Sequence, residues 1–379
     1  MNDQATLSRR LFAQLLGAGA ATAAVAPPLF GANTYSAQRP LASDTGVVRI
    51  NSNENPYGPS PAALRAITAA FPLVWRYPDE TADLLIADLA KAHGIGPEYF
   101  ALGDGSSELL KLAASAFTDA SRRLVMADPA FEAIGSGAAA AGASIVKVPL
   151  DKRFAHDLAK MREVAGEPKG AGLVYICNPN NPTGSITPKD EVRAFLDALS
   201  PKTIVMVDEA YFHYASSGEY ESVIPLVASH PNLIVLRTFS KIHGMAGLRL
   251  GYAVAQPALL EKVTDQGAWD SVNIMALAGA RASLADSAHI ADQKRRNSET
   301  RAWTIEALEK LGFHTIPSEA NFIMVDTRRE VKPLNAALRA RKIHVGRVFP
   351  AMPNHMRVTI GTPEQMRAFV KGFATVTAS

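Results

Sequence analysis

Short apolar runs, rich in β-branched residues, alternate along the chain with segments of helical periodicity. The runs occupy residues 123–128, 144–150, 172–179, 203–210, 232–240 and 251–255. Near-continuous apolar runs of this length are typical of strands that are buried on both faces. Their alternation with helices indicates βαβ units, so we predict an α/β fold whose large domain holds a mainly parallel, mixed sheet flanked by helices.

Helices are predicted over residues 106–119, 188–199 and 292–311. Pro188 and the acidic residues after it mark the start of the second helix. We assign residues 61–285 to the large domain. Residues 286–379, with a long helix and mixed short elements, are assigned to a smaller α+β domain. The turn-rich segment 45–60 is predicted to be an arm that crosses from one domain to the other.

Most of the predicted strands end in a polar residue. These residues are Asp128, Asn178 with Asn181, Asp208, and Ser240 with Lys241. The carboxyl ends of parallel strands line one crevice of an open sheet, and ligands bind there. We therefore expect these side chains to converge in space.

The composition is that of an ordinary soluble globular protein, with 47% hydrophobic and 20% charged residues among 379. The formal net charge of +3 does not indicate a nucleic-acid partner, and no metal site is predicted. A single cysteine, Cys177, excludes an internal disulfide bond, and its apolar neighbours predict an inert core residue.

The N-terminus differs from the rest of the chain. Ser8, Arg9 and Arg10 precede a short apolar run rich in Ala and Gly, so residues 1–26 resemble a twin-arginine signal peptide. The run is too short for a stable membrane span, and an ordinary amphipathic helix is the alternative. We expect export of the folded protein to the periplasm by the twin-arginine translocation machinery, with residues 27–44 as a flexible leader.

Lys241 has an unusual setting in "LRTFSKIHGMAGLRLGY", residues 236–252. Its small and hydroxylated neighbours allow a backbone to approach a ligand closely, and Arg249 follows eight residues later. An amine in a partly desolvated or cationic site has a lowered pKa and can attack a carbonyl carbon. A solvated surface lysine is the ordinary alternative. Pyridoxal phosphate requires a reactive lysine, and it is our hypothesis for the cofactor.

Other residues match the further requirements of that cofactor. Asp208, at the end of a predicted strand, could keep the pyridine nitrogen protonated, although it could also cap the next helix. Asn181 and Tyr211 are candidates to bind the ring oxygen. The glycines, serines and predicted helix start of "LGDGSSELLKLAASAF" suit a phosphate. Arg249 and Ser240 could add charge-assisted hydrogen bonds to it.

The segment "GDGSSE" also permits a dinucleotide-binding interpretation. It approaches the G-x-G-x-x-G pattern, and Asp128 follows at about the expected distance of ~20 residues. Glu108 occupies the position of the third glycine in that pattern, where the helix packs closely on the strand and a small residue is needed. This interpretation would leave Lys241 and Asp208 unexplained, so we do not favour it.

Five motifs together resemble those of fold-type-I pyridoxal-phosphate aminotransferases of class I/II, in their histidinol-phosphate aminotransferase-like branch. They are "NENPYGPSP", "RYPD", "NPNNPTG", "DEAYFHY" and "FSKIHGMAGLRLGYA", and they follow in the family's order over nearly everything after residue 45. The resemblance implies that Lys241 forms the aldimine with the cofactor and shuttles a proton. It also implies that Asp208 pairs with the pyridinium nitrogen and that Tyr211 completes the catalytic set.

The resemblance assigns further residues by position. Cofactor binding is implied for Ser106, Ser107, Phe131, Asn181, Asp208, Tyr211, Thr238, Ser240, Lys241 and Arg249. Tyr77 would reach the cofactor phosphate of the partner subunit, so a homodimer is expected. Arg357 would bind the substrate carboxylate or phosphate, and Tyr57 would also lie at the substrate. Arg347 is a candidate second anion contact, with an ordinary surface arginine as the alternative.

Departures from the family pattern bear on the substrate. The usual "PTY" segment is "PAF" here, so Phe131 could stack on the ring but lacks a hydroxyl. An exported enzyme would rarely meet histidinol phosphate, which is a cytoplasmic intermediate. We therefore expect transamination between a free amino acid, with aromatic or basic ones as first candidates, and a 2-oxo acid. Histidinol-phosphate transamination, oxidation or decarboxylation at the same site, and a non-enzymatic binding protein remain alternatives.

Overall fold

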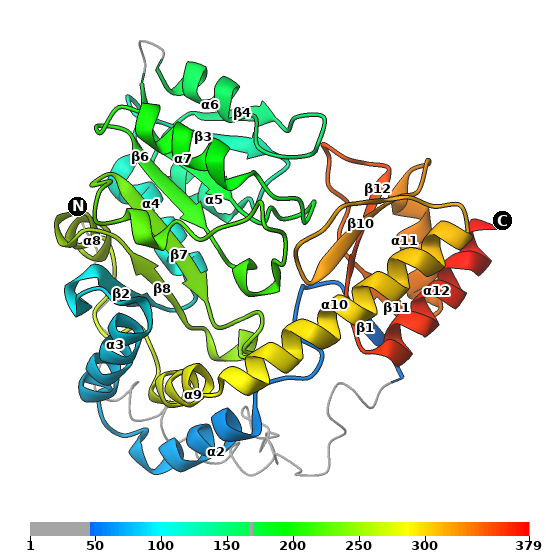
Figure 1. The fold of residues 1–379 in the computed structure, drawn as a ribbon, viewed down its shortest axis with the longest axis horizontal. Coiled ribbons are helices and arrows are strands. Elements are labelled where there is room, and N and C mark those ends of the chain that lie inside the picture. Colours follow the sequence, from blue (N-terminus) through cyan, green and yellow to red (C-terminus); the bar gives the residue numbers. More distant parts are fainter. Residues whose placement is uncertain (1–45, 167–169, 379) are drawn as a thin grey trace, which may run out of the picture. The chain divides into compact units, whose positions relative to one another are not determined.

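The central sheet of the computed structural model has seven strands within the described residues, which are 46–166 and 170–378 (Figure 1). The strand order is β2-β8-β7-β6-β5-β3-β4. The strands are β2 (Phe100–Gly103), β3 (Arg123–Asp128), β4 (Ile145–Pro149), β5 (Ala171–Cys177), β6 (Ile204–Asp208), β7 (Leu233–Thr238) and β8 (Gly251–Val254). Strands β3 to β7 pair in parallel, whereas β8 is antiparallel to both β7 and β2. The predicted mainly parallel, mixed sheet is confirmed.

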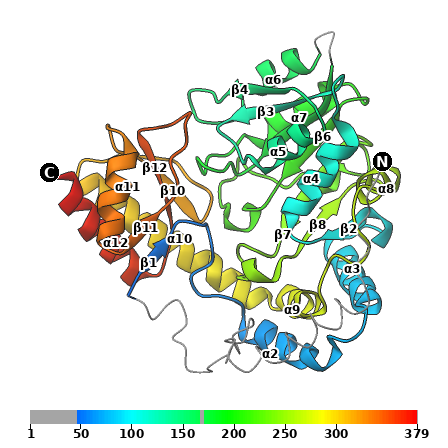
Figure 2. The ribbon, with the colours of Figure 1, turned by 180° about the vertical axis from the view of Figure 1, so that it is seen from behind.

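Helices cover both faces of this sheet, as Figures 1 and 2 show from opposite sides. One face packs against α4 (Ser106–Phe117), α5 (Ala133–Ala140) and α8 (Pro257–Thr264). The other face packs against α3 (Asp79–His93), α6 (Leu158–Ala165), α7 (Lys189–Ala198) and α9 (Ile274–Ala285).

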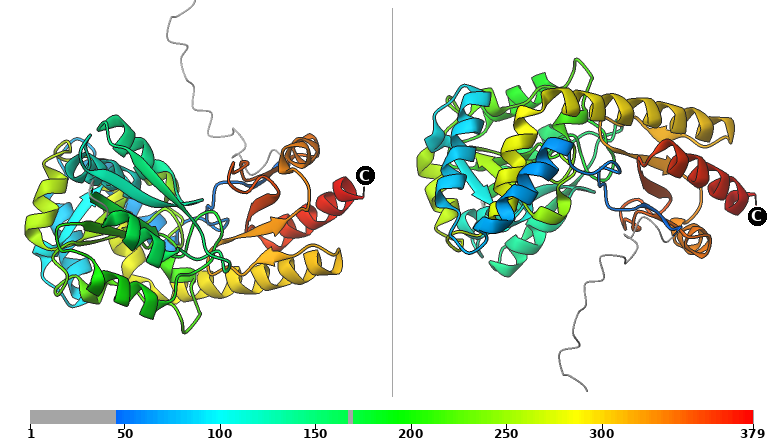
Figure 3. Two further views of the ribbon diagram at one scale, coloured as in Figure 1. Left: turned by 90° about the horizontal axis from the view of Figure 1, so that it is seen from above. Right: turned by 90° about the horizontal axis from the view of Figure 1, so that it is seen from below.

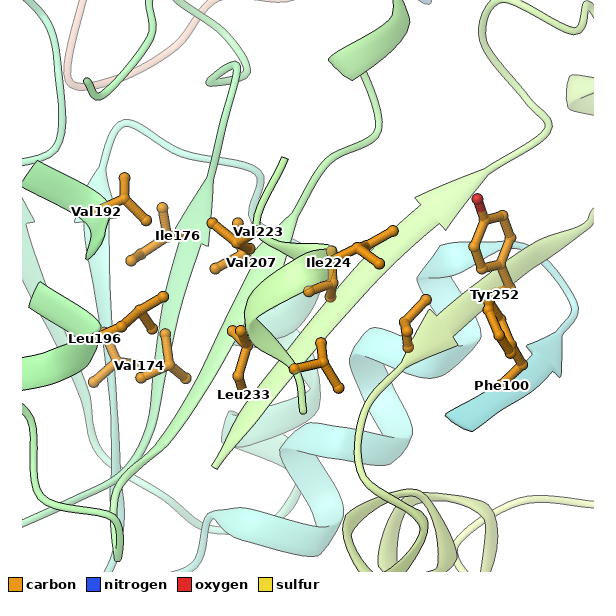
Figure 4. Packing of buried hydrophobic residues seen from close by; sticks show 14 of the residues in the cluster. Phe100, Val174, Ile176, Val192, Leu196, Val207, Val223, Ile224, Leu233 and Tyr252 are labelled. Atoms are coloured by element: carbon orange, nitrogen blue, oxygen red, sulfur yellow. The ribbon is translucent and has the colours of Figure 1, made fainter. Parts of the chain in front are cut away.

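Strand β5 shows why the apolar runs are continuous. Val174 and Ile176 pack in the core beneath α7, near Val192 and Leu196 (Figure 4). Tyr175 and its odd-numbered neighbours belong to the core on the α4 side. Because successive side chains of a strand point to opposite faces, a sheet covered on both sides needs apolar residues at every position.

A second group of elements follows α9. An antiparallel sheet contains β9 (Thr315–Ile316), β10 (Phe322–Asp326) and β12 (His355–Thr359), and β1 (Val48–Ile50) pairs in parallel with β11 (Ile343–Val345). The helices here are α10 (Ser287–Lys310), α11 (Val331–Ala340) and α12 (Pro363–Thr377), and α10 packs against α12 (Figure 3). From Val48 onward the chain forms one compact unit, so the predicted division between residues 285 and 286 stays a prediction.

The remaining described helices are short. Helix α2 (Pro61–Ala70) packs on α9, and single 3-10 turns are η2 (Phe71–Leu73), η3 (Pro97–Tyr99), η4 (Phe212–Tyr214), η5 (Ile224–Leu226) and η6 (Ala246–Leu248). No helix within residues 46–166 and 170–378 combines the length and apolar character needed to cross a membrane. The predicted signal peptide and leader lie outside the described residues.

Most boundaries of the elements that were predicted agree with the structure, whereas no range was predicted for α2, α3, α5, α6, α8, α9, α11 or α12. Two differences are instructive. The helix predicted over residues 292–311 begins at Ser287, because the side chain of Asp286 caps it by accepting a hydrogen bond from the backbone N–H of His289. Strand β2 was not predicted because its four residues carry too short an apolar pattern to distinguish.

Candidate active site

A cavity of about 180 Å³ lies beyond the carboxyl ends of β5, β6 and β7. The predicted residues that line it are Ser106, Ser107, Phe131, Asn181, Asp208, Tyr211, Thr238, Ser240, Lys241, Arg249 and Arg357. They come from the strand ends, from the start of α4 and, for Arg357, from β12. The expected convergence of strand-end side chains therefore occurs for Asn181, Asp208, and Ser240 with Lys241, since chain segments far apart in sequence meet at one edge of the sheet.

Lys241 lies directly after β7, with its Nζ 5.5 Å from the centre of the Tyr211 ring. Burial lowers the pKa of Lys241 to about 8, and the nearby charge of Arg357 acts in the same direction. The carboxylate of Asp208 opposes this shift. A lysine with this pKa carries a much larger neutral fraction near neutral pH than an exposed lysine, as a nucleophilic amine requires.

Asp208 ends β6 and is buried. The hydroxyl of Tyr175 donates to its Oδ2 at 2.9 Å, and the backbone N–H of Ala210 donates to its Oδ1 at 3.1 Å. Burial raises the pKa of Asp208 to about 6, although both hydrogen bonds act against the rise. A buried carboxylate with a raised pKa is stabilised by a cationic partner, and a protonated pyridine nitrogen would be one.

The start of helix α4 is suited to a phosphate. Its N-cap, Gly105, has a φ of +74° and supplies no side-chain cap, so the helix amides at Ser106 and Ser107 face an uncapped end. Arg249 lies over this turn, and a Cβ at Gly105 would collide with its guanidinium group. Arg249 also donates to Ser240 Oγ at 3.4 Å. Helix amides, hydroxyls and a cation together form an anion site.

Asn181, Tyr211 and Arg357 form one hydrogen-bonded set. Asn181 Nδ2 donates to the Tyr211 hydroxyl at 3.3 Å, and Arg357 Nη1 donates to Asn181 Oδ1 at 2.7 Å. Arg357 Nη2 donates to the carbonyl oxygen of Asn51 at 2.9 Å. Its buried Nε has no hydrogen-bond partner among the described residues. Arg357 is thus a buried cation with hydrogen-bonding capacity beside the cavity.

Five residues discussed from the sequence lie outside the cavity. Asn178, expected among the converging strand ends, donates instead through Nδ2 to the carbonyl oxygen of Thr187 at 2.9 Å. Tyr57 contacts Arg296, whose Cζ is 5.0 Å from its ring centre, and lines a separate small cavity with Tyr214. Tyr77 is 81% exposed, and Arg347 pairs with Glu132 at 2.6 Å. Asp128, expected among the converging strand ends, pairs instead with Lys147 of β4 at 3.4 Å, because β3 lies beside β4, far from β7.

The glycine-rich turn does not have the packing of a dinucleotide site. Glu108 accepts hydrogen bonds from the backbone N–H of Asp104 at 2.6 Å and from Ser271 Oγ at 2.9 Å. Its side chain therefore folds back over the turn at the position where the dinucleotide pattern requires a glycine.

The sequence interpretation missed Ser52, Asn53 and Tyr175. Ser52 and Asn53 line the cavity, and Tyr175 binds Asp208. A signal existed for Asn53, because it belongs to the "NENPYGPSP" motif. No signal in the sequence marked Tyr175, because its contact with Asp208 depends on how β5 and β6 pair.

Residues 45–373 match the protein family described as "Aminotransferase class I and II". The chain belongs to this family. Two relatives of the aminotransferase, each named histidinol-phosphate aminotransferase, come from Symbiobacterium thermophilum and Moorella thermoacetica. They are 39% and 37% identical over 86% and 88% of this chain, and the matches cover 89% and 86% of those proteins.

Solved structures agree with the assignment. One from Erwinia carotovora atroseptica is 33% identical with a TM-score of 0.84, covering 87% of the aminotransferase and 95% of that chain. The histidinol-phosphate aminotransferase of Sinorhizobium meliloti, solved in complex with pyridoxal-5'-phosphate, is 27% identical with a TM-score of 0.82. It covers 88% of the aminotransferase and 91% of that chain. The predicted fold-type-I architecture and the pyridoxal-phosphate cofactor are confirmed.

The fold alone would not have selected the reaction. An L-threonine-O-3-phosphate decarboxylase from Porphyromonas gingivalis shares it, with a TM-score of 0.76 at 21% identity. Family membership and the closer relatives make this chain a pyridoxal-phosphate-dependent aminotransferase. The residues present suit that cofactor, since the cavity holds an amine, a buried carboxylate and an anion site at a helix start.

Proposed function

We propose that this aminotransferase exchanges an amino group between an α-amino acid and a 2-oxo acid, with Arg357 binding the carboxylate shared by both. The observation that carries the proposal is that Lys241, Asp208 and Arg357 line one cavity. Pyridoxal phosphate, when bound, supplies a ring that accepts the electron pair left behind when a proton leaves the amine-bearing carbon.

Lys241 has two tasks in this proposal. Its Nζ would hold the cofactor covalently and, as a free amine, would move the proton of the substrate's amine-bearing carbon. Burial supports both tasks, because the lowered pKa keeps a neutral amine available near neutral pH. Tyr211, whose ring lies beside Nζ, would bind the ring oxygen of the same cofactor through its hydroxyl.

Asp208 would hold a proton at the ring nitrogen of the cofactor. It is buried, and its Oδ2 is oriented by the hydroxyl of Tyr175. The negative charge of Asp208 favours the protonated ring, and that proton makes the ring a better electron acceptor.

The anion sites orient the two ends of the reacting complex. The start of α4, with Ser240 and Arg249, would bind the cofactor phosphate. Arg357 binds the carboxylate through its planar guanidinium group. Thr238 supports the first site, because its hydroxyl donates to Ser240 Oγ at 2.9 Å.

The substrate is proposed to carry one anionic group within reach of Arg357. Arg347, the candidate for a second anion contact, is already paired with Glu132. Phe131 lines the cavity without a hydroxyl, which suits an apolar or aromatic side chain. Histidinol phosphate is the second candidate, favoured by the names of the relatives; its phosphate would take the place of the carboxylate at Arg357.

A half-reaction assay tests the proposal. The holoenzyme is mixed with single amino donors, without an acceptor, and conversion of the cofactor aldehyde to its amine form is followed by absorbance. We expect free amino acids to convert it faster than L-histidinol phosphate does. The opposite order would select the second candidate. Release of ammonia, peroxide or carbon dioxide in step with turnover would contradict transamination.

A homodimer is proposed from exposed aromatic side chains. Trp75 and Tyr77 are 76% and 81% exposed, next to Phe71 of η2. Large apolar groups gathered at a surface are typical of an interface. A second copy would cover them and would bring its Tyr77 to the cofactor phosphate. Light scattering of the Trp75→Glu variant should give a monomer mass where the parent gives a dimer; equal masses would refute this interface.

Export is proposed from the twin-arginine pattern at Arg9 and Arg10, which lie outside the described residues. Cell fractionation should find the parent in the periplasm and the Arg9→Lys, Arg10→Lys double variant in the cytoplasm. The same distribution for both proteins would refute the proposed route.

A further inference from the structure

The hydroxyl of Tyr211 receives two hydrogen bonds from asparagine side chains. Asn53 Nδ2 donates to it at 3.1 Å, and Asn181 Nδ2 donates to it at 3.3 Å. Asn53 lies in the N-terminal arm between β1 and α2, 158 positions from Tyr211, so this contact joins two distant segments. The sequence interpretation gave Asn53 no role.

The orientations of both amides are fixed by their other partners. Arg357 Nη1, which can only donate, meets Asn181 Oδ1 at 2.7 Å, so the Nδ2 of Asn181 must face Tyr211. Thr359 Oγ1 accepts from the backbone N–H of Asn53 at 2.9 Å and donates to Asn53 Oδ1 at 3.0 Å. Asn53 Oδ1 is the one acceptor of the Thr359 hydroxyl among the described residues, so this arrangement directs the Nδ2 of Asn53 to Tyr211.

The backbone of Asn53 is held as firmly as its side chain. The residue is buried at a φ of +55°, a left-handed conformation that asparagine adopts more readily than most residues. Asn321 Nδ2 donates to its carbonyl oxygen at 3.1 Å. The backbone from which the amide of Asn53 extends is therefore held in place on both counts.

These contacts decide where the proton of Tyr211 points. A phenol oxygen offers two lone pairs and one proton. The two amides occupy the acceptor capacity, and Tyr211 donates to no acceptor among residues 46–166 and 170–378. Burial raises the pKa of Tyr211 above its usual range, so the proton stays on the oxygen. It is directed into the cavity that Tyr211 lines.

We propose that Asn53 is a positioning residue that turns the Tyr211 hydroxyl into a committed hydrogen-bond donor to the ring oxygen of the cofactor. The amide does this by occupying a lone pair of the phenol oxygen, which also makes the remaining O–H a stronger donor. Asn53 touches Tyr211 and acts only through it. The inference rests on the proposed function, in which Tyr211 and Lys241 meet the same cofactor.

The effect is measurable without turnover. The cofactor's absorption changes when the nitrogen that joins it to Lys241 gains a proton. A donor at the ring oxygen stabilises the negative charge there. It favours the form in which that nitrogen is unprotonated, because no positive charge on the nitrogen then balances the oxygen. A weaker donor should therefore raise the apparent pKa of the absorption change.

The test is a spectrophotometric pH titration of four purified holoproteins. They are the parent, Asn53→Gly, Tyr211→Phe and the double variant. Glycine tolerates the positive φ, so Asn53→Gly removes the amide without backbone strain. We expect it to raise the midpoint by roughly 0.5–1 pH unit, the size expected for weakening one hydrogen bond. Tyr211→Phe should raise it at least as far, and the double variant should equal Tyr211→Phe.

Thr359 offers a matched pair of controls. Thr359→Ser keeps the hydroxyl that orients Asn53 and should leave the midpoint unchanged. Thr359→Val removes the hydroxyl, frees the amide to turn, and should shift the midpoint in the same direction as Asn53→Gly.

The outcomes separate the inference from the function on which it rests. An unshifted midpoint in Asn53→Gly, together with a shifted one in Tyr211→Phe, overturns the role of Asn53. Additive shifts in the double variant overturn it too, because Asn53 would then act by another route. Failure of the parent to take up the cofactor on Lys241 would instead refute the proposed function.

Discussion

Tyr175→Phe should make cofactor binding fail at a higher pH. Tyr175 is buried in β5, and its hydroxyl donates to Asp208 Oδ2 at 2.9 Å. The substitution removes one oxygen atom and leaves the packing of the ring. Asp208 then loses a hydrogen bond that stabilises its charged form, while its burial is unchanged.

The magnitude follows from the strength of that bond. A hydrogen bond to a charged group contributes about 1.5–3 kcal/mol, and about 1.4 kcal/mol corresponds to one pH unit. The pKa of Asp208, about 6 with the hydrogen bond in place, should therefore rise by about 1–2. At neutral pH a carboxylate that was mostly ionised becomes half or mostly protonated, and it no longer attracts a proton on the ring nitrogen.

The assay is the affinity of the apoprotein for pyridoxal phosphate, measured by fluorescence quenching between about pH 5 and 9. Affinity should fall as pH decreases through the pKa of Asp208, since protonation removes the negative charge. This decline should lie about 1–2 pH units higher in Tyr175→Phe than in the parent. Tyr214→Phe, which alters another buried tyrosine, is the matched control and should leave the midpoint in place. Identical midpoints for Tyr175→Phe and the parent would refute the reasoning.

Four further predictions concern the same cavity. Lys241→Ala should lower turnover by roughly 10⁴-fold or more while the circular dichroism spectrum stays native. Borohydride should then attach no cofactor covalently to the protein. Covalent attachment in this variant would contradict the assignment of Lys241 as the cofactor-binding lysine. Labelling of the apoprotein by the cofactor aldehyde should rise with pH, with a midpoint at about 8, because the lowered pKa of Lys241 makes its amine neutral above that pH. A midpoint near the pKa of free lysine would show that burial does not lower the pKa of Lys241. Arg357→Lys should lower kcat/KM roughly 10–100-fold for carboxylate substrates, since the planar fork is lost, and an unchanged value would exclude direct contact. Gly105→Ala should weaken cofactor affinity about tenfold, because a Cβ meets Arg249 at a positive φ.

Local patterns and topology were enough to predict the reactive end of the sheet. Lys241, Asp208 and Asn181 each follow a predicted strand, and parallel strands place their carboxyl ends together. The rule also has a limit, shown by Asp128. Its strand ends at the same edge of the sheet but lies several strands from β7, and strand order across a sheet is not a local property of the sequence.

The sequence by itself therefore determined the α/β class and the family, and it predicted which amine, carboxylate and anion-binding groups line one cavity. The tertiary structure decided how those groups are held. Asn53 and Tyr211 are 158 positions apart, and Tyr175 and Asp208 are 33 apart. Hydrophobic periodicity reports which face of an element is buried, whereas a hydrogen bond between side chains depends on strand register, rotamer and the packing of remote segments. Only the folded chain specifies these.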